Sequence, residues 1–145
     1  MPPTKVAFVC VQNAGRSQMA AAFAERERNR RDAERVDGRA WDVEIVTGGT
    51  DPADRVHDEV VEVMREVGID LSDRKPREVT PEELEGCDYV ITMGCSAEGV
   101  CPAAWSGESR DWELDDPDER GLDEVRAIRD EIERRVTALF RELED

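Results

Sequence analysis

The chain has 145 residues, of which 36 are acidic and 20 basic, and its formal net charge at pH 7 is −16. A surface of this charge repels nucleic acid and anionic membranes, and no apolar segment approaches the ~20 residues that cross a bilayer. The length suits a single domain over residues 1–145. The N-terminus lacks a secretory signal pattern, so we expect a cytoplasmic protein. Because salt screens the self-repulsion of an acidic surface, we also expect a halophilic source.

The N-terminal segment predicts a buried strand that leads into a helix. Apolar residues fill most positions from Lys5 to Cys10, which is typical of a short strand. Apolar residues then recur at helical spacing behind Ser17 and predict a helix that runs toward Arg31. The highly charged stretch 25–35 is expected to continue that helix as a solvated extension or loop.

The middle of the chain predicts a second strand and two further helices. Apolar and acidic residues alternate over 41–45, which indicates a strand. A helix follows around residues 58–67, with Gly68 placed as its left-handed stop. The run Thr80–Glu83 combines a capping box with proline at the first helical position, so a short helix begins there.

The last third of the chain predicts two strands and a long helix. Tyr89–Met93 reads as a buried strand, and a short strand is expected near residues 109–114. Three- and four-residue steps of apolar side chains mark the final helix, at Val125, Ile128, Ile132, Val136, Leu139 and Leu143.

The alternation of strands and helices predicts a three-layer α/β fold. Its centre is a four-stranded parallel sheet, doubly wound in the flavodoxin-like manner, with helices on both faces. Ligands of such sheets bind outside the carboxyl ends of the strands. The loop after the first strand, Cys95 after the third and Asp116 after the fourth therefore converge on one edge.

The loop that follows the first strand has the composition of an oxyanion-binding nucleophile. Cys10 is separated by five residues from Arg16, whose planar fork can bind two oxygens of a tetrahedral anion. Backbone N–H groups and the helix N-terminus favour an anion here, and they favour thiolate over thiol. Gly15 is the residue of this loop suited to positive φ. The predicted oxyanion-binding residues are Val11, Gln12, Asn13, Ala14, Gly15, Arg16 and Ser17.

Several motifs together resemble the low-molecular-weight protein tyrosine phosphatase superfamily, which includes the thioredoxin-coupled arsenate reductases. The resemblance covers nearly the whole chain. Its segments are Cys10–Ser17, Thr47–Val56, Val63–Ser72, Val90–Cys95 and Asp111–Pro117. The resemblance implies the low-molecular-weight tyrosine phosphatase fold and a cysteine-based reaction on an oxyanion, arsenate or phosphate.

For the arsenate reductases, the resemblance implies that Cys10 attacks arsenate while Arg16 binds it. Asp116 is then the general acid, with Asp115 as an alternative. Cys95 and Cys101 are the disulfide shuttle that thioredoxin, or a similar dithiol donor, re-reduces. The segment between these two cysteines is rich in small residues, which suits a moving shuttle.

Other interpretations stay open at this point. Water could resolve a phosphocysteine at Cys10, which would make the protein a low-molecular-weight tyrosine phosphatase. A redox sensor or anion-binding module without turnover is a third hypothesis, and a buried cysteine can simply pack in the core. Cys87 precedes the third strand at the opposite edge, so we expect it to pack. With His57 as the lone histidine and no Cys-x2-Cys spacing, we expect no metal site, and no cofactor is implied.

Overall fold

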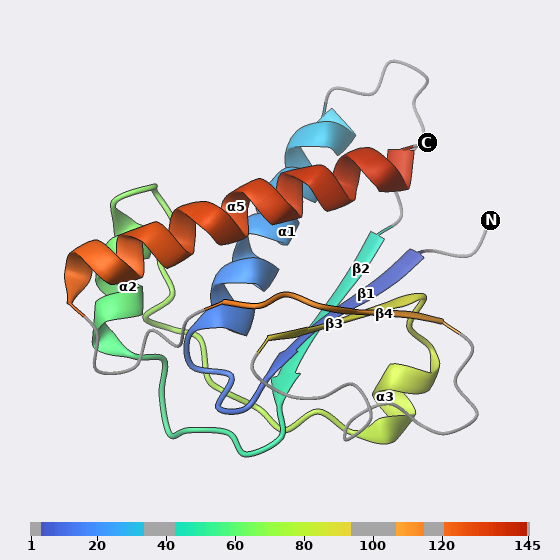
Figure 1. Ribbon diagram of the computed structural model, residues 1–145, viewed down its shortest axis with the longest axis horizontal. Helices are drawn as coiled ribbons and strands as arrows, with labels where there is room; N and C mark the ends of the chain where they lie inside the picture. The colour runs from blue at the N-terminus through green and yellow to red at the C-terminus, as the bar shows by residue number, and fades with distance from the viewer. Residues whose placement is uncertain (1–3, 34–42, 94–106, 115–120, 145) are drawn as a thin grey trace.

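The structure, a computed structural model, describes residues 4–33, 43–93, 107–114 and 121–144. Its strands are β1 (Thr4–Cys10), β2 (Val43–Gly49), β3 (Tyr89–Met93) and β4 (Glu108–Asp111). Its helices are α1 (Arg16–Ala33), α2 (Asp58–Arg65), α3 (Pro81–Glu85) and α5 (Leu122–Glu144). Figure 1 shows their arrangement.

All four strands are parallel and lie in the order β2-β1-β3-β4, which confirms the predicted sheet. β1 is central, and Cys10, its last residue, is in register with Gly49 of β2 and Met93 of β3. The nucleophile candidate therefore lies at the carboxyl end of the innermost part of the sheet, where doubly wound folds bind their ligands.

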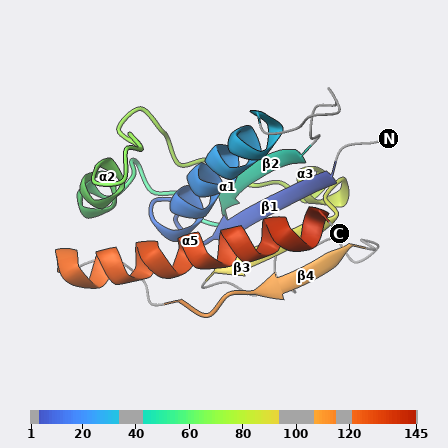
Figure 2. The ribbon, with the colours of Figure 1, turned by 90° about the horizontal axis from the view of Figure 1, so that it is seen from above.

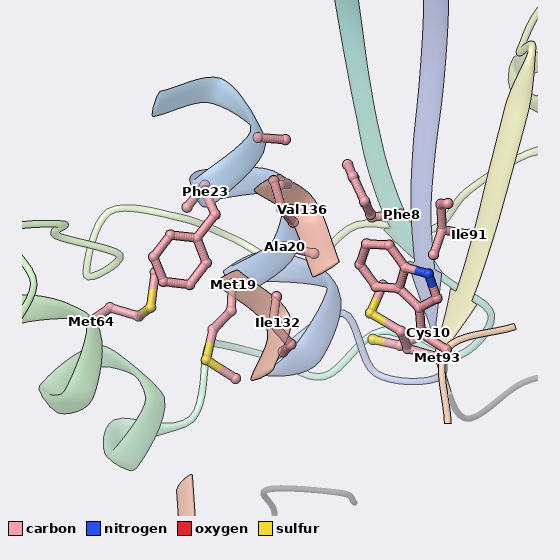
Figure 3. Packing of buried hydrophobic residues seen from close by; sticks show 14 of the residues in the cluster. Phe8, Cys10, Met19, Ala20, Phe23, Met64, Ile91, Met93, Ile132 and Val136 are labelled. Atoms are coloured by element: carbon pink, nitrogen blue, oxygen red, sulfur yellow. The ribbon is translucent and has the colours of Figure 1, made fainter. Parts of the chain in front are cut away.

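Alternate residues of β1 face two different helical layers. Phe8 and Cys10 belong to the larger apolar cluster, which contains the buried faces of α1, α2 and α5 (Figure 3). Ala7 and Val9 belong to a second cluster on the other face, with residues of α3 and its neighbours. Figure 1 shows α1 and α5 on one side of the sheet and α3 on the other, and in Figure 2, seen from above, α1 and α5 lie over the strands. The predicted three-layer architecture is confirmed.

Two predicted helix boundaries are confirmed in detail. Thr80 accepts a hydrogen bond from the Glu83 N–H, and the Glu83 side chain accepts one from the Thr80 N–H, so α3 begins with the expected capping box. Gly68 follows α2 with φ of +83°, a conformation that glycine adopts without the strain of a Cβ.

The charged end of α1 is helical through Ala33, so of the two expectations for this stretch the helical extension is confirmed over the described residues and the loop is not. Glu27 pairs with Arg30 and with Arg31, one turn along the helix, and pairs at this spacing stabilise a helix. The start of the predicted second strand, with Trp41, lies outside the described residues. None of the helices in the described part of the chain could cross a membrane.

Candidate active site

Cys10 is positioned between a strand end and a helix start. It closes β1, its side chain is 3% exposed, and α1 begins six residues later at Arg16. The five intervening residues form the connecting loop, here called the Cys10 loop (11–15). The positive end of the α1 dipole and the loop amides therefore lie beside the sulfur, as the sequence predicted.

Two groups approach the sulfur of Cys10. The backbone N–H of Asn13 donates to it at 3.2 Å, and the hydroxyl oxygen of Ser17 lies 2.8 Å from it. The Asn13 amide nitrogen donates to that same hydroxyl oxygen at 2.7 Å. Either atom of the Ser17–Cys10 pair could donate, but an ionised sulfur can only accept, so with a Cys10 thiolate the serine proton lies on the line to the sulfur. Two donors then converge on Cys10, an arrangement that stabilises a thiolate.

Asn13 organises the loop from a fully buried position. Its side-chain oxygen accepts from the Arg77 backbone N–H at 3.1 Å and from Gln18 at 3.0 Å. Since a backbone N–H can only donate, these bonds fix which end of the amide is oxygen. The amide nitrogen must then face Ser17 and Thr47, and its distance to the Thr47 hydroxyl is 3.0 Å.

The left-handed position of the loop is Asn13, with φ of +52°, and not Gly15. Asparagine tolerates this conformation better than most residues because its short polar side chain can hydrogen-bond locally. The sequence contained this signal, but glycine is the default choice for positive φ. At Gly15 the chain has already turned toward the helix, and its carbonyl accepts from the Met19 N–H at 3.0 Å.

The segment 50–57 binds the outer side of the Cys10 loop. Four of its backbone N–H groups donate to carbonyls at or beside the nucleophile. The bonds are Thr50 to Cys10 (3.2 Å), Asp51 to Val11 (2.8 Å), Ala53 to Gln12 (2.9 Å) and His57 to Ala14 (3.0 Å). With its carbonyls held outward, the loop presents its N–H side to the sulfur, as the Asn13 N–H shows. This is the orientation that a nest for an anion requires.

Two adjacent glycines at the end of β2 allow this close approach. A Cβ on Gly49 would lie 2.5 Å from the Val11 carbonyl oxygen and 3.0 Å from the Asn13 nitrogen. A Cβ on Gly48 would lie 2.7 Å from the Cβ of Val79. The sequence indicated these glycines only through the resemblance of Thr47–Val56, because their neighbours come from distant parts of the chain.

Arg16 lies at the first position of α1 with 8% of its surface exposed. Its Nη1 donates to the backbone carbonyl of Leu114 at 3.1 Å. Leu114 follows β4 and directly precedes the Asp115–Asp116 pair. The structure therefore brings together Cys10, Arg16, Ser17 and the chain that leads to the predicted acid.

The remaining predicted site residues lie outside the described part of the chain. These are Asp116 with its alternative Asp115, and the shuttle pair Cys95 and Cys101, so their roles stay predictions. Cys87 is described and packs as expected. It is 4% exposed within the second apolar cluster, and its sulfur lies 3.4 Å from the Glu83 carbonyl oxygen.

His57 contributes a contact that sequence reasoning missed. Its Nε2 lies 3.1 Å from the side-chain oxygen of Gln12, so the ring links the N-terminus of α2 to the exposed rim of the Cys10 loop. No sequence signal indicated this pairing, because all of α1 and β2 lie between the two residues.

Comparison with known proteins decides the family. The model of the family described as "Low molecular weight phosphotyrosine protein phosphatase" matches residues 5–145. The chain belongs to this family. The family is the one that the sequence motifs resembled, and the match extends over all described elements except the first residue of β1.

Relatives of this phosphatase-family chain carry reductase names. The chain is 61% identical over 139 residues to the "Putative arsenate reductase" of Halobacterium salinarum. The match covers 96% of this chain and 92% of the relative. That relative comes from a halophile, as expected for this chain from its acidic surface.

Two solved structures share the fold. The thioredoxin-dependent arsenate reductase of Corynebacterium glutamicum has a TM-score of 0.76 and 34% identity. The match covers 99% of this chain but 63% of that one. An arsenate reductase in its phosphate-binding state has a TM-score of 0.75 and 30% identity, over 96% of this chain and 98% of the other.

Proposed function

We propose that this family member reduces arsenate to arsenite, with Cys10 as the nucleophile. The observation that carries the proposal is the pair of donors on the Cys10 sulfur, at the base of a loop whose carbonyls are bound on its outer side. We call the Cys10 sulfur, the Cys10 loop and Arg16 together the cup. A cup of this kind accepts a tetrahedral oxyanion, and its thiolate can attack the central atom of that anion. The 61% identical relative and the two solved reductases support arsenate as that oxyanion.

In the first step, the Cys10 thiolate forms a bond to arsenic while an oxygen leaves as water. Asp116 supplies a proton to the leaving oxygen. Arg16 and the amides of the Cys10 loop bind the remaining oxygens, whose negative charge they neutralise. The product of this step is a thiol–arsenate adduct in which arsenic is still pentavalent.

In the second step, the Cys95 thiolate attacks the sulfur of Cys10. A Cys10–Cys95 disulfide forms, the sulfur–arsenic bond breaks, and its electron pair leaves with arsenic as arsenite. Cys101 then attacks Cys95, which frees the Cys10 thiolate and leaves a Cys95–Cys101 disulfide. A dithiol donor reduces this disulfide and is itself oxidised.

Thioredoxin is the donor we propose, because the structurally similar protein from Corynebacterium glutamicum is thioredoxin-dependent. A dithiol is required by the chemistry in any case, because each turnover moves two electrons and ends in a disulfide. We also propose that the reaction takes place in the cytoplasm, where a reducing environment keeps the cysteines as thiols.

Phosphotyrosine hydrolysis is the alternative, since it needs only Cys10, Arg16 and the acid. The reductase names of the relatives do not favour it. An anion-binding module without turnover is the remaining alternative. Replacement of Cys10 separates this third case from the other two, because both enzymatic reactions stop without the nucleophile.

The Cys95→Ser variant tests the proposal. We expect arsenate-dependent oxidation of a thioredoxin system to be abolished, because the reaction stops at the Cys10–arsenate adduct, while hydrolysis of an aryl phosphate survives. The matched control is Cys87→Ala, which removes a buried thiol far from the cup and leaves turnover in place. If the Cys95→Ser variant consumed arsenate at the original rate, the reductase proposal would be wrong.

A further inference from the structure

The chain that follows β4 is anchored to the sheet by Trp112. The backbone N–H of Trp112 donates to the Thr92 carbonyl at 2.9 Å, so pairing with β3 continues one residue beyond the strand. Its indole is 8% exposed and lies 5.9 Å from the Phe8 ring, at an interplanar angle of 49°. Trp112 is therefore held by both central strands, next to the end of β1.

Leu114 lies two residues farther along and is fixed by the same core. Its side chain is partly buried and packs against the cluster that contains Phe8, Cys10 and Trp112. Its carbonyl accepts the bond from Arg16 Nη1. The direction of this carbonyl thus depends on how firmly Trp112 and Leu114 hold the chain to the sheet.

Arg16 needs such a partner because its side chain is long. A free guanidinium loses considerable rotamer entropy when it is fixed on an anion, and a pre-oriented one loses less. The backbone of Arg16 is already fixed because it is part of the helix. The hydrogen bond to the Leu114 carbonyl then restricts the torsions of the Arg16 side chain.

We propose that Trp112 is a positioning residue for Arg16. By anchoring the chain after β4, it sets the Leu114 carbonyl that pre-orients the guanidinium for the oxyanion. The inference deepens the proposed function, since it concerns the same cup, but it requires only that the cup binds an oxyanion. Phosphate binding can therefore test it whether or not arsenate is reduced.

The test is protection of Cys10 from iodoacetamide by inorganic phosphate, followed by mass spectrometry of the Cys10 peptide in the full-length chain. The alkylation rate without phosphate reports on the sulfur, and the phosphate concentration that halves the rate reports on the oxyanion site. For Trp112→Ala we expect phosphate affinity to fall about tenfold, the scale of one hydrogen bond to a charged group. The unprotected alkylation rate should change less than about twofold.

Three further variants keep the test sharp if Trp112→Ala folds poorly. Trp112→Phe retains an aromatic ring against Phe8 and should keep most of the affinity. Phe140 is fully buried on α5, so Phe140→Leu should lower the free energy of unfolding without weakening phosphate binding. In an Arg16→Lys background, replacement of Trp112 should change phosphate affinity less than about twofold, because the pre-oriented group is gone.

The proposal is overturned if a folded Trp112→Ala protein binds phosphate like the unmodified chain. It is also overturned if the Trp112 effect keeps its full size in the Arg16→Lys background. A parallel loss of the unprotected alkylation rate would contradict it too, because Trp112 would then act on the whole Cys10 loop.

Discussion

The hydroxyl oxygen of Ser17 lies 2.8 Å from the sulfur of Cys10 and accepts a hydrogen bond from the Asn13 side chain, so it can donate its own proton to a Cys10 thiolate. This relationship links the first turn of α1 to the last residue of β1. It gives the serine a chemical role, the stabilisation of negative charge on the nucleophile, beyond its position in the loop.

Replacement of Ser17 by alanine removes one of the two donors on the sulfur. We expect alkylation of Cys10 by iodoacetamide at pH 6 to slow about tenfold, because a hydrogen bond to a charged group is lost. A variant that reacts like the parent at pH 6 would show that Ser17 does not stabilise the thiolate.

Gly49→Ala is expected to distort the Cys10 loop. The new Cβ would lie 2.5 Å from the Val11 carbonyl oxygen, a backbone atom that cannot rotate away. Overpacking of this kind costs about 1–3 kcal/mol, measurable by urea unfolding, and should also lower turnover. Gly86→Ala is the control, because its Cβ would meet only the Lys5 side chain, at 3.5 Å. Equal stability of the two variants would contradict this account of the loop.

Asp116→Asn tests the predicted general acid. Formation of the covalent adduct at Cys10 should slow roughly 100-fold, because the leaving oxygen departs unprotonated, while the affinity for phosphate should barely change. Rapid-quench measurement of the adduct separates the two effects. Asp115→Asn examines the alternative acid in the same way, and the larger loss in that variant would move the role to Asp115.

Acid should weaken the contact between α2 and α5. Hydrogen bonds from Arg126, then from Arg129, lower the pKa of Glu66 to about 2 from its ordinary value of 4.5. A lowered carboxyl pKa stabilises the fold above about pH 4.5, and this contribution is lost as the pH falls toward 2. The free energy of unfolding of Glu66→Gln, measured with urea, should therefore be lower than that of the parent at pH 6. The difference should shrink by pH 3.

Glu62→Gln, an exposed change one turn earlier in α2, is the control for that experiment. It removes a negative charge from the same helix without touching the Arg126 and Arg129 contacts. If Glu66→Gln and Glu62→Gln showed the same pH dependence, the arginine contacts would not be its cause.

The order of elements and the location of Cys10 at the end of a buried strand could be predicted from the sequence because both depend on local patterns. An apolar run ends at Cys10 and a helical pattern begins after it, so the loop between them was defined without knowledge of the fold. The capping box at Thr80 is similarly local, since all its contacts lie within one turn.

The contacts that shape the cup could not be predicted, because they join distant residues. The Arg16 guanidinium meets the Leu114 carbonyl across 98 positions of sequence, and the Asn13 amide meets the Arg77 N–H across 64. Either Asn13 or Gly15 could have taken the positive φ in this loop. Asn13 takes it, and hydrogen bonds from Arg77 and Gln18 to its side chain hold it there. That residues 1–145 form one domain stays a prediction.

In the proposed mechanism, everything depends on Cys10 as a charged nucleophile at the base of an oxyanion-binding cup. We would test this by measuring the alkylation rate of Cys10 by iodoacetamide at pH 7, with and without inorganic phosphate, at the Cys10 peptide. We expect Cys10 to react faster than free cysteine under the same conditions, because two donors meet its sulfur, and we expect phosphate to slow the reaction. A Cys10 that reacts no faster than free cysteine, and that phosphate does not protect, would rule out the proposed oxyanion site.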